Sequence, residues 1–191
     1  PMEKVQEFSA DIYRESRRLL ELVNDIIKLS RLDEGGDKLE RQRVELHALA
    51  ENVLANLESV AEKCHVTLSL TGGAAYVTGV PALLSEMLYN LCDNAVKYNV
   101  DGGSVRVDIA QSTAETVLTV SDTGIGIPYA HQSRVFERFY RVDKSHSKAV
   151  GGTGLGLSIV KHAAQYHNAR LELKSAVGKG TDIRIHFPHA P

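Results

Sequence analysis

The N-terminal part of the chain carries hydrophobic residues at helical spacing. They recur near a heptad interval, with charged residues between them, at Ile12, Leu19, Val23 and Ile26. This pattern predicts one long helix over residues 2–34, which Gly35 and Gly36 end. A single helix cannot bury such a stripe by itself. It either packs on the rest of this chain or, as the linker after it favours, joins a helical bundle with another chain or with residues outside this sequence.

From residue 37 onward the pattern changes to mixed helix and strand. Helical periodicity predicts helices at Leu46–Lys63, from Pro81 to about Tyr98, at Ala130–Phe139 and at Leu155–His167. Alternation of apolar and polar residues predicts strands at Val66–Leu70, Val105–Ile109, Val117–Val120, Leu171–Leu173 and Ile183–Phe187. This order predicts an α/β sandwich, with helices packed on one face of a mixed, mostly antiparallel sheet. The chain thus divides into a helix within residues 1–36 and a domain over 37–191.

Composition narrows the class of protein. The 191 residues are 43% hydrophobic and 24% charged, as in soluble globular proteins. A formal net charge of −2 gives no support for nucleic-acid binding. No apolar window of about 18 residues and no signal peptide is visible. We interpret Cys64 and Cys92 as reduced core residues, and the eight histidines show no metal-ligand spacing.

A short run after a predicted strand, Asp122-Thr123-Gly124-Ile125-Gly126-Ile127-Pro128, can approach a ligand closely. Its two glycines allow the backbone to turn sharply. The carboxylate of Asp122 can accept a hydrogen bond from an exocyclic amine. A plain turn is the alternative interpretation.

A second run, Gly151-Gly152-Thr153-Gly154-Leu155-Gly156-Leu157, opens a predicted helix. Backbone amides of glycine-rich segments at a helix N-terminus bind anions and suit phosphate. The run is neither a P-loop nor a dinucleotide fingerprint, because it lacks the Lys-Ser/Thr ending and no strand leads directly into it. A flexible hinge is the alternative.

The third run, "YNLCDNAVKYN" at residues 89–99, places Asn90, Asn94 and Lys97 on one helix face. Amide oxygens are hard ligands that suit Mg²⁺, and Lys97 adds a charge for phosphate. The polar outer face of an amphipathic helix is the alternative. Together the three runs are able to enclose a nucleotide from its base to its γ-phosphate.

In this order, the motifs resemble the catalytic, ATP-binding domain of sensor histidine kinases, in the superfamily shared with gyrase, Hsp90 and MutL. "YNLCDNAVKYN" is similar to the N box, "DTGIGIP" to the G1 box, "FERFYRVD" to the F box, "GGTGLGLSIVK" to the G2 box and "GKGT" to the last glycine turn. The resemblance covers residues 37–189. "LVNDIIKLSRLDEGG" is similar to the end of the second helix of the dimerisation and histidine-phosphotransfer domain. This implies a homodimer through helix 2–34 in the full protein.

The resemblance also assigns roles to residues. It implies that Asn94 binds Mg²⁺ with Asn90 assisting, that Asp122 accepts from adenine N6, and that Arg141 reaches the γ-phosphate; Asn90 and Arg141 are the implied catalytic residues. It further implies a lid, about Arg138–Thr153, that orders around bound phosphate. The other residues implied at ATP are Lys97, Tyr98, Gly124, Gly126, Ile127, Lys148, Gly152, Thr153, Gly154, Leu155, Gly156, Leu157 and Thr181.

Asn90 distinguishes between two fates of the γ-phosphoryl group. Related ATPases carry glutamate at the matching position, as a base for water. An amide cannot act as a general base, so we expect the phosphoryl group to be kept for another acceptor. The family's acceptor is a histidine in an H-E/D-x-x-T/N-P run, which this sequence lacks. We therefore expect ATP binding without autophosphorylation in a truncated, cytoplasmic part of a kinase whose membrane attachment lies in N-terminal segments.

The expected partner of the full protein is the receiver domain of a response regulator, whose aspartate takes the phosphoryl group from the histidine. Three alternatives stay open. One is a noncatalytic dimerisation or scaffold module with a degenerate pocket. The second is a hydrolysing ATPase of the same superfamily, which Asn90 disfavours. The third is an anti-sigma-type serine kinase, which the helix at 2–34 disfavours.

Overall fold

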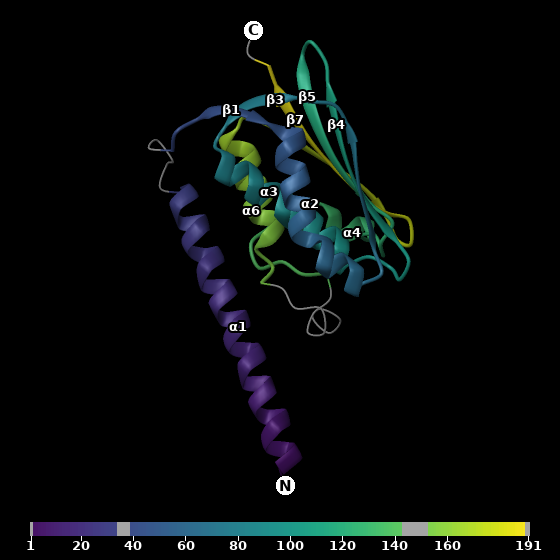
Figure 1. Cartoon of the computed structure of the whole chain (residues 1–191). Helices are drawn as coiled ribbons and strands as arrows, with labels where there is room; N and C mark the ends of the chain where they lie inside the picture. Colours follow the sequence, from purple (N-terminus) through teal and green to yellow (C-terminus); the bar gives the residue numbers. More distant parts are fainter. Residues whose placement is uncertain (1, 34–38, 143–152, 190–191) are drawn as a thin grey trace.

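The structure, a computed structural model, describes residues 2–33, 39–142 and 153–189 (Figure 1). Its main sheet has five strands in the order β2-β4-β5-β7-β6. Their bounds are Thr67–Gly72 for β2, Ser104–Gln111 for β4, Glu115–Asp122 for β5, Arg170–Ala176 for β6 and Gly180–Pro188 for β7. The β2 and β4 strands are parallel, and every other neighbouring pair is antiparallel. The expected hairpin is the β4–β5 pair.

Three helices cover one face of this sheet: α2 (Leu46–Lys63), α3 (Pro81–Lys97) and α6 (Gly156–Tyr166) (Figure 1). The predicted α/β sandwich is therefore confirmed. The core lies between the two layers, because apolar residues at helical spacing on α3 meet the inward-facing residues of the central strands. Its fully buried side chains include Leu84, Met87, Leu88, Val105, Leu118 and Ile185.

A second, two-stranded sheet pairs β1 (Gln42–Glu45) with β3 (Tyr76–Gly79), and the sequence did not predict it. Each strand has only four residues, too few for alternation to stand out. A cation–π contact joins the two strands: the Arg43 guanidinium lies 3.9 Å from the centroid of the Tyr76 ring. The Glu45 carboxylate caps α2 by accepting from the backbone N–H groups of His47 and Ala48, at 2.8 and 2.6 Å.

The predicted helix at Ala130–Phe139 was wrong in extent. Only α4 (Tyr129–Gln132) is helical there, and the chain continues in turns. The N–H of Arg134 bonds to the carbonyl of His131, and that of Glu137 to Arg134, each three residues back. Phe139 then has a φ of +63°, which no α-helix accommodates. Its N–H donates to the Gly154 carbonyl at 2.9 Å, so a long-range bond replaces the helical one.

The two cysteines differ in environment. Cys92 lies in the core on α3, where burial raises the pKa of its thiol to about 12. The core assignment is confirmed for Cys92 and wrong for Cys64, which is exposed because it caps the C-terminal end of α2.

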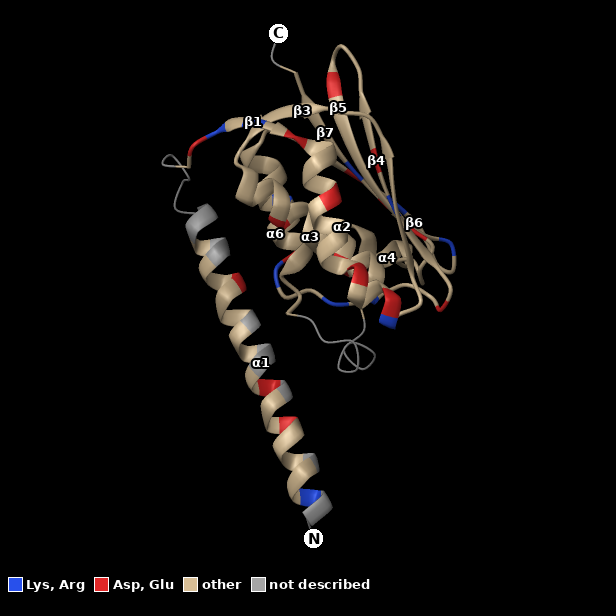
Figure 2. Cartoon of the chain, in the orientation of Figure 1, with Lys and Arg blue, Asp and Glu red and all other residues tan. Residues whose placement is uncertain are grey.

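The long N-terminal helix is α1 (Met2–Asp33), and the expected helix-ending glycines lie outside the described residues. It extends away from the sandwich, and charged residues occur along its length (Figure 2). Most of its apolar stripe is exposed: Val5, Phe8, Ile12, Leu19, Leu20, Val23, Ile26 and Ile27. Of its described side chains, Leu22 packs against Leu155 and Ile159. Among the described helices, none combines the length and apolarity needed to cross a membrane.

A buried histidine joins the end of α6 to the start of α3. The Nδ1–H of His167 donates to the Ala163 carbonyl at 2.7 Å, and its Nε2 accepts from the Val80 N–H at 3.0 Å. A Cβ at Gly79 would lie 2.6 Å from the imidazole ring, so the fit is tight. Both bonds require the neutral Nδ1–H tautomer. Burial lowers the pKa of His167 below its ordinary value of 6.5.

This histidine predicts a loss of stability in mild acid. A lowered histidine pKa means that the unfolded chain binds more protons, so the stability linked to neutral His167 is present above about pH 6.5 and is lost as pH falls below it. We expect the urea midpoint of His167→Gln to depend less on pH between 7 and 5 than that of the wild type, since glutamine still offers an acceptor to Val80. His65→Asn, at an exposed position, is the control. Parallel curves for wild type and His167→Gln would contradict this.

Candidate functional site

The structure brings the Asn-bearing face of α3 against the start of α6. A Cβ added to Gly156 would lie 2.8 Å from Asn90 Oδ1 and 3.5 Å from Asn94 Nδ2. Asn90, Asn94 and Lys97 are all half-buried on α3. Two of the runs that the sequence singled out therefore share one junction, and Gly156 is glycine because Asn90 occupies the space of a side chain.

The side chain of Asn90 is oriented by its own helix. Its Nδ2 donates to the Glu86 carbonyl at 2.8 Å. This bond leaves Oδ1 facing Gly156, and an amide oxygen is the atom that binds a hard cation. Sequence reasoning missed Glu86, although the four-residue spacing to Asn90 was visible.

Lys97 is paired on the same helix. Its Nζ lies 2.6 Å from Asp93 Oδ2, and the two side chains are 35% and 17% exposed. An i, i+4 spacing on a helix permits this salt bridge, so the pairing of Asp93 with Lys97 could also have been predicted from the sequence. A phosphate at this position would share Lys97 with Asp93.

Asp122 ends β5 with a carboxylate held by the backbone. Its Oδ1 accepts from the Gly124 N–H at 2.8 Å, and the Thr181 N–H also bonds to the carboxylate. Burial raises the pKa of Asp122 above its ordinary value, because desolvation outweighs the lowering by these two donors. The carboxylate is thus partly withdrawn from water at a fixed position.

The loop after Asp122 is a close junction of three backbone segments. A Cβ at Gly124 would lie 2.3 Å from the Tyr98 carbonyl, and one at Gly126, where φ is +70°, would lie 2.0 Å from the Ala176 carbonyl. The Ile125 N–H donates to Tyr98 O at 3.0 Å. The end of α3, the end of β5 and the β6–β7 turn are therefore locked together, and the glycines are required for this contact.

Thr181 lies across from Asp122 in the β5–β7 register. Its Oγ1 lies 2.9 Å from Ser175 Oγ, and Ser175 Oγ accepts from the Ile127 N–H at 2.8 Å. Two predicted residues, Thr181 and Ile127, are thus joined through Ser175. The sequence offered no signal for Ser175, since its role depends on strand pairing.

The F-box and G2-box runs meet through Phe139 and Gly154, which has a φ of +75°. Next to this tie, the Thr153 hydroxyl donates to Asp25 Oδ2 of α1 at 2.8 Å. Leu155 is fully buried against Leu22 of α1. The sequence left packing of the helix on the rest of the chain open, but it did not predict which residues make these contacts.

The structure describes only some of the remaining expected residues. Lys148, Gly152 and most of the expected lid lie outside the described residues. Arg141 is half-buried at the edge of the described part, and Arg138 bonds to His162 of α6 at 2.9 Å. Leu157 packs against the main core.

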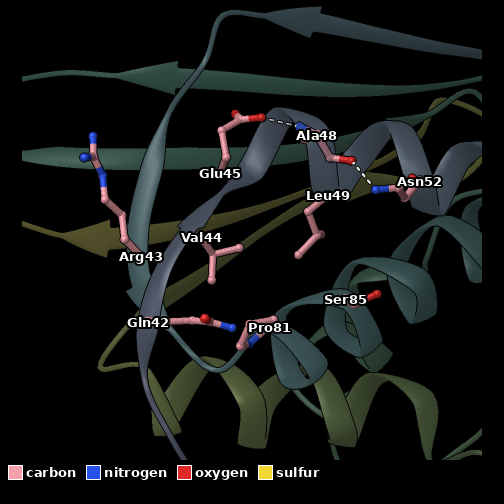
Figure 3. Close-up of a pocket in the computed structure, with 9 residues that line it drawn as sticks. All are labelled: Gln42, Arg43, Val44, Glu45, Ala48, Leu49, Asn52, Pro81 and Ser85. Carbon is pink, nitrogen blue, oxygen red and sulfur yellow. Dashed lines mark hydrogen bonds between the residues drawn. The ribbon is translucent and has the colours of Figure 1, made fainter.

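A cleft of about 450 Å³ lies elsewhere, between β1 and the N-terminal ends of α2 and α3 (Figure 3). It is lined by Gln42, Arg43, Val44, Glu45, Ala48, Leu49, Asn52, Pro81 and Ser85. None of these residues was expected at a nucleotide. The size of this cleft therefore gives no support for the expected site, whose residues lie elsewhere.

Comparison with known proteins places the chain in a family. Residues 79–191 match the family described as histidine kinase-, DNA gyrase B- and HSP90-like ATPase. The chain belongs to this family. It is 35% identical, over 98% of its length, to the sensor-like histidine kinase SenX3 of Mycolicibacterium smegmatis. It is 36% identical, over 93% of its length, to the phosphate regulon sensor protein PhoR of Pseudomonas aeruginosa.

Solved structures agree with these relatives. A solved chain of the mycobacterial sensor histidine kinase MprB aligns with a TM-score of 0.69 and 29% identity, over 80% of this chain and 99% of the solved one. Full-length ShkA in complex with AMPPNP aligns with a TM-score of 0.80 and 25% identity, over 93% of this chain and 37% of ShkA. The chain thus carries the ATP-binding catalytic domain of a sensor histidine kinase. It spans 49% of SenX3 and 40% of PhoR.

The raised pKa of Asp122 predicts the pH dependence of a variant. A raised carboxyl pKa means that the folded state binds more protons, so Asp122 favours folding more as pH falls through that pKa toward 3.8. Asp122→Asn should be the more stable chain at pH 7, and its advantage in urea unfolding should shrink as pH falls from 7 toward 4. Asp101→Asn, which removes an exposed carboxylate, is the control. An advantage that grows in acid would refute the assignment.

Proposed function

We propose that this chain binds Mg-ATP and that, within a longer protein, it transfers the γ-phosphoryl group to a histidine for relay to a response-regulator aspartate. The observation that supports it most is the junction of Asn90, Asn94 and Gly156. It brings a hard-ligand face of α3 and a glycine-rich helix start together. Asp122 lies at the end of β5, where the adjoining loop begins, and backbone donors fix its carboxylate.

In this proposal the amide oxygens of Asn94 and Asn90 hold Mg²⁺, and the start of α6 receives the phosphates. The Asp122 carboxylate accepts from the exocyclic amine of adenine. Lys97 and Arg141 neutralise charge on the phosphates, the main requirement of phosphoryl transfer besides positioning. Asn90 favours transfer over hydrolysis, because its amide cannot deprotonate water.

The proposal extends to partners. The apolar stripe of α1 is exposed in this chain alone, and an apolar helix face of this length needs another element to cover it. In our proposal, the second subunit of a homodimer of the longer protein covers it. A receiver domain is the partner that takes the phosphoryl group. We place this part of the protein in the cytoplasm, with membrane attachment through segments N-terminal to it.

Nucleotide affinity tests the assignment of the site. We expect Asn94→Ala to abolish the gain in ATP affinity that Mg²⁺ provides, and Asp122→Asn to weaken ATP binding with or without Mg²⁺. Gly156→Ala should weaken Mg-ATP binding about tenfold, or ~1.4 kcal/mol, because its methyl group meets Asn90 Oδ1 at 2.8 Å. Gly73→Ala, where a Cβ meets nothing within 4 Å, is the matched control. Calorimetric titration gives each affinity.

Two binding results would contradict the assignment of the site in different ways. If Asp122→Asn bound ATP as tightly as the wild type, the proposed contact between Asp122 and adenine would be excluded. No binding at millimolar ATP would favour a scaffold module with a degenerate pocket.

Phosphoryl transfer gives a second test. Because none of the eight histidines lies in an acceptor run, we expect no radiolabel from γ-³²P-ATP on this chain alone and no steady phosphate release. Label on the chain would overturn the first expectation. Phosphate release that Asn90→Ala abolishes would instead identify a hydrolysing ATPase.

A further inference from the structure

The two edge strands of the main sheet differ in how they are protected against pairing with another chain. On β6, charged side chains alternate along the edge strand at Arg170, Glu172 and Lys174, with Lys174 Nζ 2.9 Å from Glu172. The Gln132 side chain also donates to the Ser175 carbonyl at 2.8 Å. These are the usual defences against pairing with another chain. The β2 strand, with the sequence "TLSLTG", carries no charge at all.

The backbone of β2 presents unpaired groups on its outer side. The Thr67 N–H donates to the Gly103 carbonyl at 2.9 Å, toward β4. Since backbone direction alternates along a strand, the N–H and C=O groups of Leu68 and Leu70 face away from β4. Within the described part of the chain, no hydrogen bond to these four groups is present. They form a template for one more strand.

A groove of about 330 Å³ runs beside this edge, between β2 and α2. Its apolar wall includes Leu54, Leu68 and Leu70. Glu58 and Glu62, one helical turn apart on α2, line the same groove. No described lining residue is basic, and neither glutamate has an ion pair within the described residues. Figure 2 shows acidic residues toward the C-terminal end of α2.

We propose that β2 is a docking edge for an extended segment of a partner protein with Lys or Arg at alternate positions. The segment adds as a sixth strand, and its backbone pairs with Leu68 and Leu70. Its inward side chains face the groove, where the aliphatic stem of Lys or Arg covers Leu54 and Leu70 while the charged end reaches Glu58 and Glu62. Its outward side chains lie beside Thr67, Ser69 and Thr71. This interaction is independent of the proposed nucleotide site.

The test uses this chain and an eight-residue peptide of alternating threonine and lysine with blocked ends. We expect peptide binding to shift the amide NMR signals of Leu68 and Leu70 and to slow their hydrogen exchange. Glu58→Lys combined with Glu62→Lys should weaken binding at least tenfold and leave ATP affinity unchanged. Glu51→Lys, on the same helix outside the groove, is the matched control. A peptide with glutamate in place of lysine should not bind.

Strand addition is checked through the peptide backbone. In antiparallel addition the lysine amides pair with β2, and in parallel addition the threonine amides do. Of two peptides N-methylated on one set or the other, one should therefore fail to bind. The proposal is overturned if both methylated peptides bind, if the glutamate peptide binds equally, or if no binding occurs at millimolar peptide. Protection of Leu68 and Leu70 that depends on protein concentration alone would assign the edge to a second copy of this chain instead.

Discussion

The site depends on one constraint: three segments of backbone meet without room for side chains. At the end of β5, Gly124 and Gly126 lie against carbonyls of α3 and of the β6–β7 turn, and a Cβ at Gly180 would lie 1.9 Å from the Asp122 carbonyl. Backbone contacts this close have few alternative arrangements. The junction therefore sets the position of Asp122 relative to α3, and through α3 relative to Asn90 and the start of α6. The binding of base, metal and phosphate that we propose would need that fixed spacing.

Much of this arrangement could be predicted from local patterns. The helices α2, α3 and α6 have strong apolar periodicity. The glycine and asparagine runs are conspicuous because these residues destabilise helices and are therefore unexpected there. The β1–β3 pair escaped prediction because four-residue strands carry little periodicity. The helix expected to reach Phe139 failed because a bond from Phe139 to Gly154 replaces the helical one. Distance along the chain hides such bonds from any local pattern.

Contacts between the two parts of the chain were also beyond the sequence. Leu22 and Asp25 looked like ordinary members of a helix that pairs elsewhere, yet they contact Leu155 and Thr153. The same helix therefore has two surfaces. Its long apolar stripe is exposed, and a short patch contacts the glycine-rich segment. Because Thr153 and Leu155 flank Gly154, a rotation of α1 against the domain would act directly on the backbone that the phosphates are proposed to contact.

The bond between Phe139 and Gly154 has a consequence for the length of the chain between them. It brings Phe139 and Gly154 together, although 14 residues separate them in the sequence. The entropy of closing a flexible loop rises slowly with length, by about 0.6 kcal/mol for each doubling. We therefore expect a change in the number of residues between Phe139 and Gly154 to cost the sandwich little free energy. The two residues that make the bond are more constrained, because both have a positive φ.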